Sequence, residues 1–126
     1  MQESTTIFLS PPTIQHILEN SGQATASLLQ DLTTGIAKLE ALLLSYHFQS
    51  RERVFNVSVD ERSITVNADG NGHFTAVYMI GVFNACADID HTDATRMKID
   101  LDVKNFETGE TVLTGELAYE RGPDEL

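Results

Sequence analysis

The spacing of apolar residues changes once along the chain, near residue 50. Before that point apolar residues recur every three or four positions, the spacing that places them on one face of a helix. After it they recur at every second position, as in strands with one buried face. The chain is therefore expected to form an α+β domain in which an N-terminal helical segment packs on an antiparallel sheet.

Residues 11–47 carry the helical pattern, after a short extended arm at residues 5–9. Ser10 is suited to the N-cap, and the two prolines after it to a first helical turn, where a missing N–H costs little. Gly22 could end a first helix in a left-handed conformation, or the helix could continue. From residue 23 the apolar stripe comprises Leu28, Leu32, Ile36, Leu39, Leu43 and Tyr46. The pattern predicts one long helix or two consecutive helices.

Residues 51–121 carry the strand pattern and predict a meander of about five strands, followed by a loose tail at residues 122–126. A turn at residues 60–63 is expected to separate the first two strands. Residues 73–90 are apolar on both faces, which is typical of a central strand, and their length indicates a bend or bulge near Gly81. Later residues expected to face inward are Met97, Ile99, Leu101, Val103, Leu113, Leu117 and Tyr119.

The end of the helical segment is apolar around most of its circumference. Its apolar side chains are Leu42, Leu43, Leu44, Tyr46 and Phe48. One sheet covers one face of a helix, so the other face needs cover from a second protomer or from the N-terminal arm. Because soluble monomers rarely expose such a patch, we expect a homo-oligomer with these five residues in its interface.

Composition places the chain among globular proteins. Its 126 residues fit a single domain, with 41% hydrophobic and 21% charged residues. Cys86 is the only cysteine, which excludes an intrachain disulfide and fits a reducing compartment. The first residues lack the basic and apolar regions of a signal peptide, and no apolar run is long enough for a membrane helix. We therefore expect a cytoplasmic protein.

The chain is strongly acidic, with 19 acidic and 8 basic residues and a formal net charge of −11. Such a field repels phosphate backbones and anionic lipid surfaces. Neither nucleic acid nor a membrane is therefore expected as a partner. The expected partner is the chain itself, and a second possibility is another protein with a basic or apolar surface.

One segment has the spacing of a calcium-binding loop, with Asn67, Asp69 and Asn71 at alternate positions before Gly72. The last ligand position of an EF-hand loop would then be Tyr78, which cannot supply the two carboxylate oxygens that calcium needs there. The flanking residues also alternate as strands, whereas an EF-hand loop lies between helices. The segment is better explained as a hairpin turn, because Asn, Asp and Gly tolerate left-handed dihedrals.

A second polar cluster comprises Asp88, Asp90, His91 and Asp93. Carboxylates and histidine could hold a metal, but a polar loop between strands, capped by Asp and Thr side chains, explains this composition better. Cys86 would need a base such as His73 or His91 to act as a nucleophile, and its small apolar neighbours favour a buried structural thiol. No catalytic residue, metal or cofactor is therefore predicted.

Two functions fit these features. The first is a non-enzymatic oligomerisation or assembly module, because the helix has excess apolar surface and no catalytic constellation is visible. The alternative is a binding protein or enzyme for a small apolar ligand or acyl thioester. Its basis is an expected outline that resembles hotdog folds and nuclear-transport-factor-like cones, a resemblance that transfers no catalytic residue. A pocket in such a fold is expected to contain Tyr78, Phe83, Asn84, His91 and Tyr119, beside Leu42.

Overall fold

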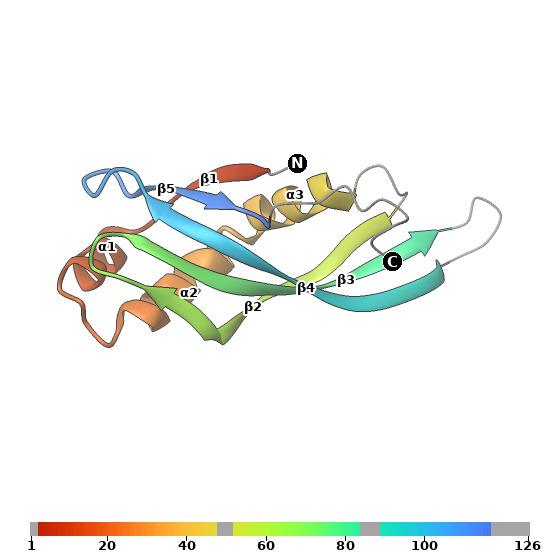
Figure 1. The fold of residues 1–126 in the computed structure, drawn as a ribbon, viewed down its shortest axis with the longest axis horizontal. Helices are drawn as coiled ribbons and strands as arrows, with labels where there is room; N and C mark the ends of the chain where they lie inside the picture. The colour runs from red at the N-terminus through yellow and green to blue at the C-terminus, as the bar shows by residue number, and fades with distance from the viewer. Residues whose placement is uncertain (1–2, 48–51, 84–88, 117–126) are drawn as a thin grey trace, which may run out of the picture.

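The computed structural model describes residues 3–47, 52–83 and 89–116, and it confirms the α+β architecture (Figure 1). The helices in this part of the chain are α1 (Pro11–Leu18), α2 (Ala24–Thr34) and α3 (Ile36–His47). The strands are β1 (Ser4–Phe8), β2 (Glu52–Val66), β3 (Asn71–Phe83), β4 (Ile89–Val103) and β5 (Glu110–Thr114). All five strands belong to one antiparallel sheet in the order β1-β5-β4-β3-β2.

The sheet is a meander from β2 to β5, and β1 adds a strand beside β5. The expected extended arm at residues 5–9 is therefore an edge strand of the sheet, paired from Ser4 opposite Thr114 to Phe8 opposite Glu110. Only one residue of this strand, Ile7, is buried, and one buried position does not form the alternating pattern that predicts a strand from sequence. The sheet thus begins before the helices.

The described helical region contains three helices, where one or two were expected. The chain leaves the helical conformation at Gly35, the C-cap of α2, before α3 begins. The first helix ends at Glu19, and Asn20, with a φ of 52°, adopts the left-handed conformation that we expected of Gly22. Asparagine tolerates this conformation better than most residues with a side chain. Short helices allow the segment to follow a curved sheet.

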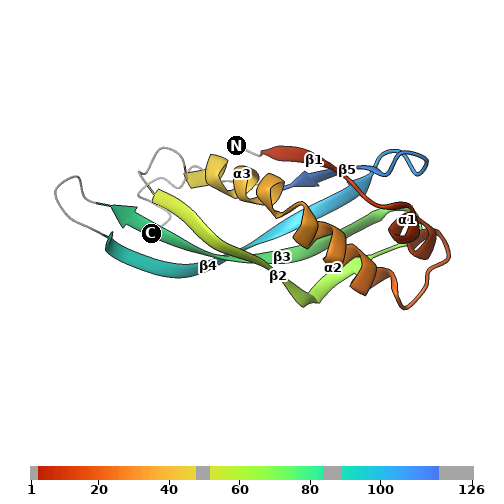
Figure 2. The same ribbon diagram turned by 180° about the vertical axis from the view of Figure 1, so that it is seen from behind.

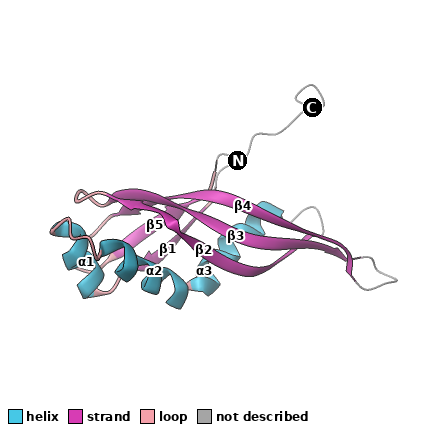
Figure 3. Ribbon diagram, turned by 90° about the horizontal axis from the view of Figure 1, so that it is seen from below, coloured by secondary structure: helices cyan, strands magenta, loops and turns pink. Residues whose placement is uncertain are grey.

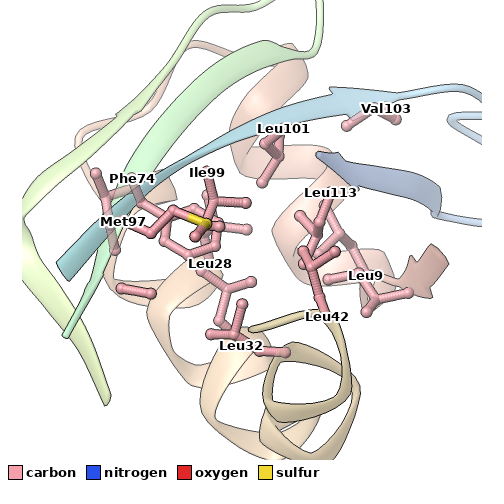
Figure 4. Close-up of a cluster of buried hydrophobic side chains, with 14 of the residues drawn as sticks. Leu9, Leu28, Leu32, Leu42, Phe74, Met97, Ile99, Leu101, Val103 and Leu113 are labelled. Atoms are coloured by element: carbon pink, nitrogen blue, oxygen red, sulfur yellow. The ribbon is translucent and has the colours of Figure 1, made fainter. Parts of the chain in front are cut away.

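The helices lie on one face of the sheet, and no helix of the described residues lies over the opposite face (Figures 2 and 3). Both α2 and α3 contact β2, and α3 also contacts β1, so α3 reaches both edge strands. The core lies between the two layers. Side chains that meet there include Leu28, Leu32, Leu42, Phe74, Met97, Ile99, Leu101 and Leu113 (Figure 4). The predicted inward face of β4 is confirmed, whereas Leu117 and Tyr119 lie outside the described residues.

The strand pairing contains local irregularities. No turn separates two strands at residues 60–63, because β2 continues through a register shift between Asp60 and Thr65. Ser63 holds this bulge together: its hydroxyl donates to the Asp60 carbonyl at 2.6 Å and accepts the Thr75 N–H at 2.7 Å. A β-bulge therefore stands where a turn was predicted. The pairing of β3 with β4 shifts between Val82 and Phe83, close to Gly81, where a bend or bulge was expected.

The segment with calcium-like spacing is the turn between β2 and β3. Asn67 donates its N–H to the Asn71 carbonyl at 2.8 Å, and Gly70 donates to the Asn67 carbonyl at 2.9 Å. Gly70 has a φ of 92°, which glycine adopts at little cost. The Asp69 carboxylate accepts the Asn71 N–H at 3.0 Å, so it stabilises the turn itself. The predicted hairpin turn is confirmed.

Candidate functional site

The apolar end of the helical segment is largely covered by its own chain. Leu42 and Leu43 are 3% and 0% exposed, so the expectation that they form an interface is wrong for the described fold. The prediction assumed that the sheet covers only one side of the helix. In the structure α3 contacts β1 as well as β2, so strands at both edges of the sheet cover it. Leu44 is 44% exposed and remains available to a partner, and Phe48 lies outside the described residues.

Of the five residues expected in a ligand pocket, the structure describes the side chain of Tyr78 alone. Tyr78 is 2% exposed and belongs to the core. Phe83 and His91 lie near one another on β3 and β4, where Val82 pairs with His91. Asn84 and Tyr119 lie outside the described residues. The structure therefore places only the Tyr78 side chain among these five, and it serves packing.

The described ranges contain no group of three or more His, Cys, Asp or Glu side chains placed to hold a metal. Asp88 of the polar cluster considered above falls outside those ranges, and so does Cys86. Among the described residues, no helix is both long and apolar enough to cross a membrane.

A chain of hydroxyl groups joins α1 to α2. The Asp31 carboxylate accepts both the N–H and the hydroxyl of Ser10, at 2.9 and 3.0 Å. The Ser10 hydroxyl lies 3.0 Å from that of Thr13, which lies 2.6 Å from that of Ser27. Ser10 thus uses its hydroxyl between helices and makes no cap bond, contrary to its predicted role. These contacts include no histidine that could activate a serine, so the network fixes the two helices together.

Tyr46 joins the ends of β1 and β5. Its hydroxyl accepts the Glu3 N–H at 2.8 Å and donates to the Glu116 carbonyl at 2.8 Å. Burial raises the pKa of this phenol, and the nearby Glu3 and Glu116 charges add to the rise. The side chain expected in an intermolecular interface therefore makes its hydrogen bonds within the chain, and it occupies a backbone acceptor at the end of β5.

The printed pairing of β4 with β5 ends where Asp100 lies opposite Thr114, and the contacts change at Glu116. Lys104 donates its N–H to the Glu110 carbonyl at 2.8 Å, so even-numbered residues of the two strands face each other. If this alternation continued, the Lys98 N–H would donate to the Glu116 carbonyl. That carbonyl accepts from Tyr46 instead, and Lys98 donates to the Glu116 carboxylate at 2.7 Å. A side chain thus replaces the backbone at the last position of the ladder.

The consequence is an open stretch of sheet edge. On one side β4 pairs with β3 along its length, but on the other it pairs with β5 only from Asp100 to Val103. The N–H and C=O groups of Ala94 and Arg96 point to the same side as those of Lys98, away from β3. No strand in the described part of the chain pairs with them there. We call residues 94–98 the free β4 edge, although at its end the Lys98 N–H is occupied by the Glu116 carboxylate.

The other two edges are less suited to pairing. The pairing of β2 with β3 shifts at two places, and Asn56 at the first has a φ of 53°. Bulges of this kind are a common protection of edge strands. The other edge strand, β1, is only five residues long. The free β4 edge is regular by contrast, since the pairing of β3 with β4 has no shift from Thr92 to Asp102.

An apolar row crosses the outer face of the sheet and ends at this edge. Phe55 pairs with Met79, and Met79 pairs with Ala94, so the three side chains share the face away from the helices. Val77 lies on the same face, and Val77, Met79 and Phe55 are all partly exposed. The two-sided apolar character of β3 was expected to mean burial on both sides. In the described chain only the face toward the helices is covered.

Comparison with known proteins finds no match for this chain among protein-family models, curated proteins or solved structures. Sequence reasoning named none of Ala94, Arg96 and Lys98 as candidates. The pattern predicted a last strand from residue 111 to residue 120; β5 is described as Glu110–Thr114, and residues 117–120 lie outside the described residues. The hydrogen bond from Tyr46 to the Glu116 carbonyl was also missed, because it depends on the tertiary structure.

Proposed function

We propose that this chain is a non-enzymatic assembly module that associates with copies of itself by sheet extension at the free β4 edge. The observation that supports the proposal is that the described pairing of β4 with β5 ends at Asp100 and Thr114, and no described strand pairs with β4 on that side before Asp100. Unpaired N–H and C=O groups along an edge strand are a ready template for another strand.

The side chains of the edge fit this proposal. Ala94, Arg96 and Lys98 are exposed, so a strand can approach without displacing core residues. Beside them lies the partly exposed pair of Met79 and Phe55 on the outer face. A second chain would satisfy the backbone groups and cover part of this apolar surface, and the two effects together favour association.

Proline at position 96 tests the proposal. The Arg96 N–H points away from β3, so Arg96→Pro removes a donor from the free edge without removing a ladder bond to β3. Arg96→Thr is the matched control, since it removes the same charge but keeps the N–H and suits a strand. Circular dichroism and thermal unfolding establish that both variants are folded.

The measurement is molar mass by light scattering across about a hundredfold range of protein concentration. The wild type and Arg96→Thr are expected to gain mass as concentration rises, whereas Arg96→Pro stays a monomer. A wild type that is monomeric throughout, or an Arg96→Pro variant that assembles like the wild type, would contradict the proposal.

A further inference from the structure

We infer that the outer face of the sheet is a docking surface for an acidic amphipathic helix of another protein. The surface consists of Phe55, Val77, Met79, Arg96 and Lys98, and we call it the outer patch. It uses side chains on the face of the strands, so it needs none of the backbone groups of the free β4 edge. Docking here is therefore independent of the self-association proposed above.

The strand register gathers these side chains on one face. Met79 lies opposite Phe55 on β2 and Ala94 on β4, and Val77 lies opposite Arg96. Side chains of residues directly opposite each other point to the same face of a sheet. The three apolar residues of the patch are partly exposed, and Arg96 is exposed. An apolar row across three strands therefore lies directly beside a guanidinium group.

The direction of this face follows from the burial of β3. Phe74, Ala76 and Tyr78 are buried in the core between the sheet and the helices. Successive side chains of a strand point to opposite faces, so Val77 and Met79 point away from the helices. No helix of the described residues lies over that face (Figure 3). In the described part of the chain the apolar row is thus open to a partner.

The two cations of the outer patch have no partner among the described residues. Neither the Arg96 guanidinium nor the Lys98 ammonium forms an ion pair with a described carboxylate. Against a net charge of −11, these two exposed side chains form a local region of opposite sign. Asp60 on β2 and Asp100 on β4 bound this region at the Lys98 end. The positive charge is therefore concentrated beside the apolar row.

An apolar row beside unpaired cations fits a ligand that carries apolar groups beside carboxylates. Contact with the row removes apolar surface from water, and a carboxylate beside Arg96 accepts charge-assisted hydrogen bonds. A nucleic acid or an anionic membrane presents charge over a wide area, so the field of the whole acidic chain repels it. A few carboxylates near Arg96 respond to the local charge, because salt screens interactions beyond about 8–10 Å. The net charge indicated a basic partner, whereas the charge of this face indicates an acidic one.

The position of the patch on the face of the sheet favours a helix as its occupant. A strand laid on this face would leave its own N–H and C=O groups unpaired, whereas a helix pairs most of them within itself. The row from Phe55 to Ala94 crosses two spacings between strands, about 10 Å, which two turns of helix cover. A helix along this row places its apolar stripe over Phe55 and Met79 and one margin beside Arg96.

A synthetic helical peptide of about 14 residues, roughly four turns, is the probe. Its leucines form one apolar stripe, and its glutamates lie along one margin of that stripe. One control peptide has glutamine in place of each glutamate, and a second has the same composition in scrambled order. The protein carries a fluorophore and is kept dilute, so that it is monomeric, while each peptide is titrated and binding is followed by thermophoresis.

The glutamate peptide should bind the wild type at least about fivefold more tightly than either control peptide. Arg96→Glu should weaken its binding about tenfold, because a cation beside the carboxylates becomes an anion. Met79→Thr should weaken it about fivefold, because the variant suits a strand but removes apolar surface. Lys38→Glu is the matched control, since it makes the same charge change at an exposed position of α3, and its binding should stay within about twofold of the wild type.

Equal binding of the glutamate and scrambled peptides would overturn the inference, and so would equal weakening by Arg96→Glu and Lys38→Glu. Tighter binding of the wild type to vesicles of phosphatidylserine than to the peptide, lost in Arg96→Glu, would assign the patch to a membrane instead. Circular dichroism establishes that the variants are folded. Arg96→Gln, which removes the charge without reversing it, should weaken binding about threefold and provides the same test if Arg96→Glu does not fold. A wild type that never self-associates leaves these measurements unchanged, so the two proposals fail separately.

Discussion

Tyr46→Phe should destabilise the fold, because the phenol hydroxyl joins α3 to the ends of two strands. The substitution keeps the ring and its packing and removes only the oxygen. The Glu3 N–H then loses its acceptor, and the Glu116 carbonyl loses its donor, each at 2.8 Å. Both groups belong to the backbone, so neither can move away without disturbing β1 or β5.

The magnitude follows from these two hydrogen bonds. A neutral hydrogen bond contributes a net stability of about 0.5–1.5 kcal/mol. Tyr46 and Glu3 are only partly buried, so water can replace part of what is lost. We therefore expect the free energy of unfolding to fall by about 1–2 kcal/mol in total. For a domain of this size each kcal/mol corresponds to a fall in Tm of about 3–5 °C.

The hydroxyl also predicts a pH dependence. Burial, with the nearby carboxylates, raises the pKa of Tyr46 in the folded chain above its usual value. The folded state therefore favours the neutral phenol. This contribution to stability is fully present below about pH 10, the unfolded pKa, and is lost as pH rises through the folded pKa. The stability difference between wild type and Tyr46→Phe should shrink over that window.

Urea unfolding at low protein concentration, at pH 7 and at a series of values up to pH 11, measures both effects. Ser45→Ala is the matched control, because Ser45 is an exposed neighbour whose hydroxyl donates only to the Leu42 carbonyl of the same helix. Its stability should remain within about 0.5 kcal/mol of the wild type. A Tyr46→Phe variant as stable as Ser45→Ala would refute the role assigned to the hydroxyl.

Three further outcomes are expected. Leu101→Ala should cost about 2–5 kcal/mol, since Leu101 is 2% exposed and pairs with Gly72, which has no side chain to fill the cavity. Asp102→Ala should cost less than about 1 kcal/mol, because its ion pair with Lys104 is exposed, and equal costs in urea unfolding would contradict the assigned faces. Gly72→Ala should lower Tm strongly, because an added Cβ would collide with the Thr65 carbonyl oxygen, and an unchanged Tm would refute that contact. Adding calcium should change Tm no more than another salt at the same ionic strength does. A rise in Tm that is specific to calcium would show that the turn at Asp69 binds the ion.

The sequence predicted features that depend on local pattern. The inward face of β4 followed from strict alternation between Met97 and Val103, and the turn at Gly70 followed from residues that tolerate left-handed dihedrals. The helical region was also predicted, because its apolar stripe has a helical period. In each case the information lies within a few neighbouring residues.

The features that were missed depend on residues far apart in the chain. A single buried Ile7 does not indicate a strand, and β1 forms because β5 offers an unpaired edge. That strand gives α3 a second cover, which is why Leu43 is buried where an interface was expected. The contact that follows β5 is a hydrogen bond between residues 46 and 116. No periodicity reports such a contact, so the free β4 edge could not be predicted.

Amide hydrogen exchange at two protein concentrations about a hundredfold apart tests most directly whether copies of the chain meet at the free β4 edge. The Ala94 and Arg96 amides should exchange rapidly in the dilute sample and slowly in the concentrated one. The Ile99 amide, which points toward β3, should be protected in both. Exchange of Ala94 and Arg96 at the same rate in both samples, while the mass of the protein rises with concentration, would place the interface elsewhere.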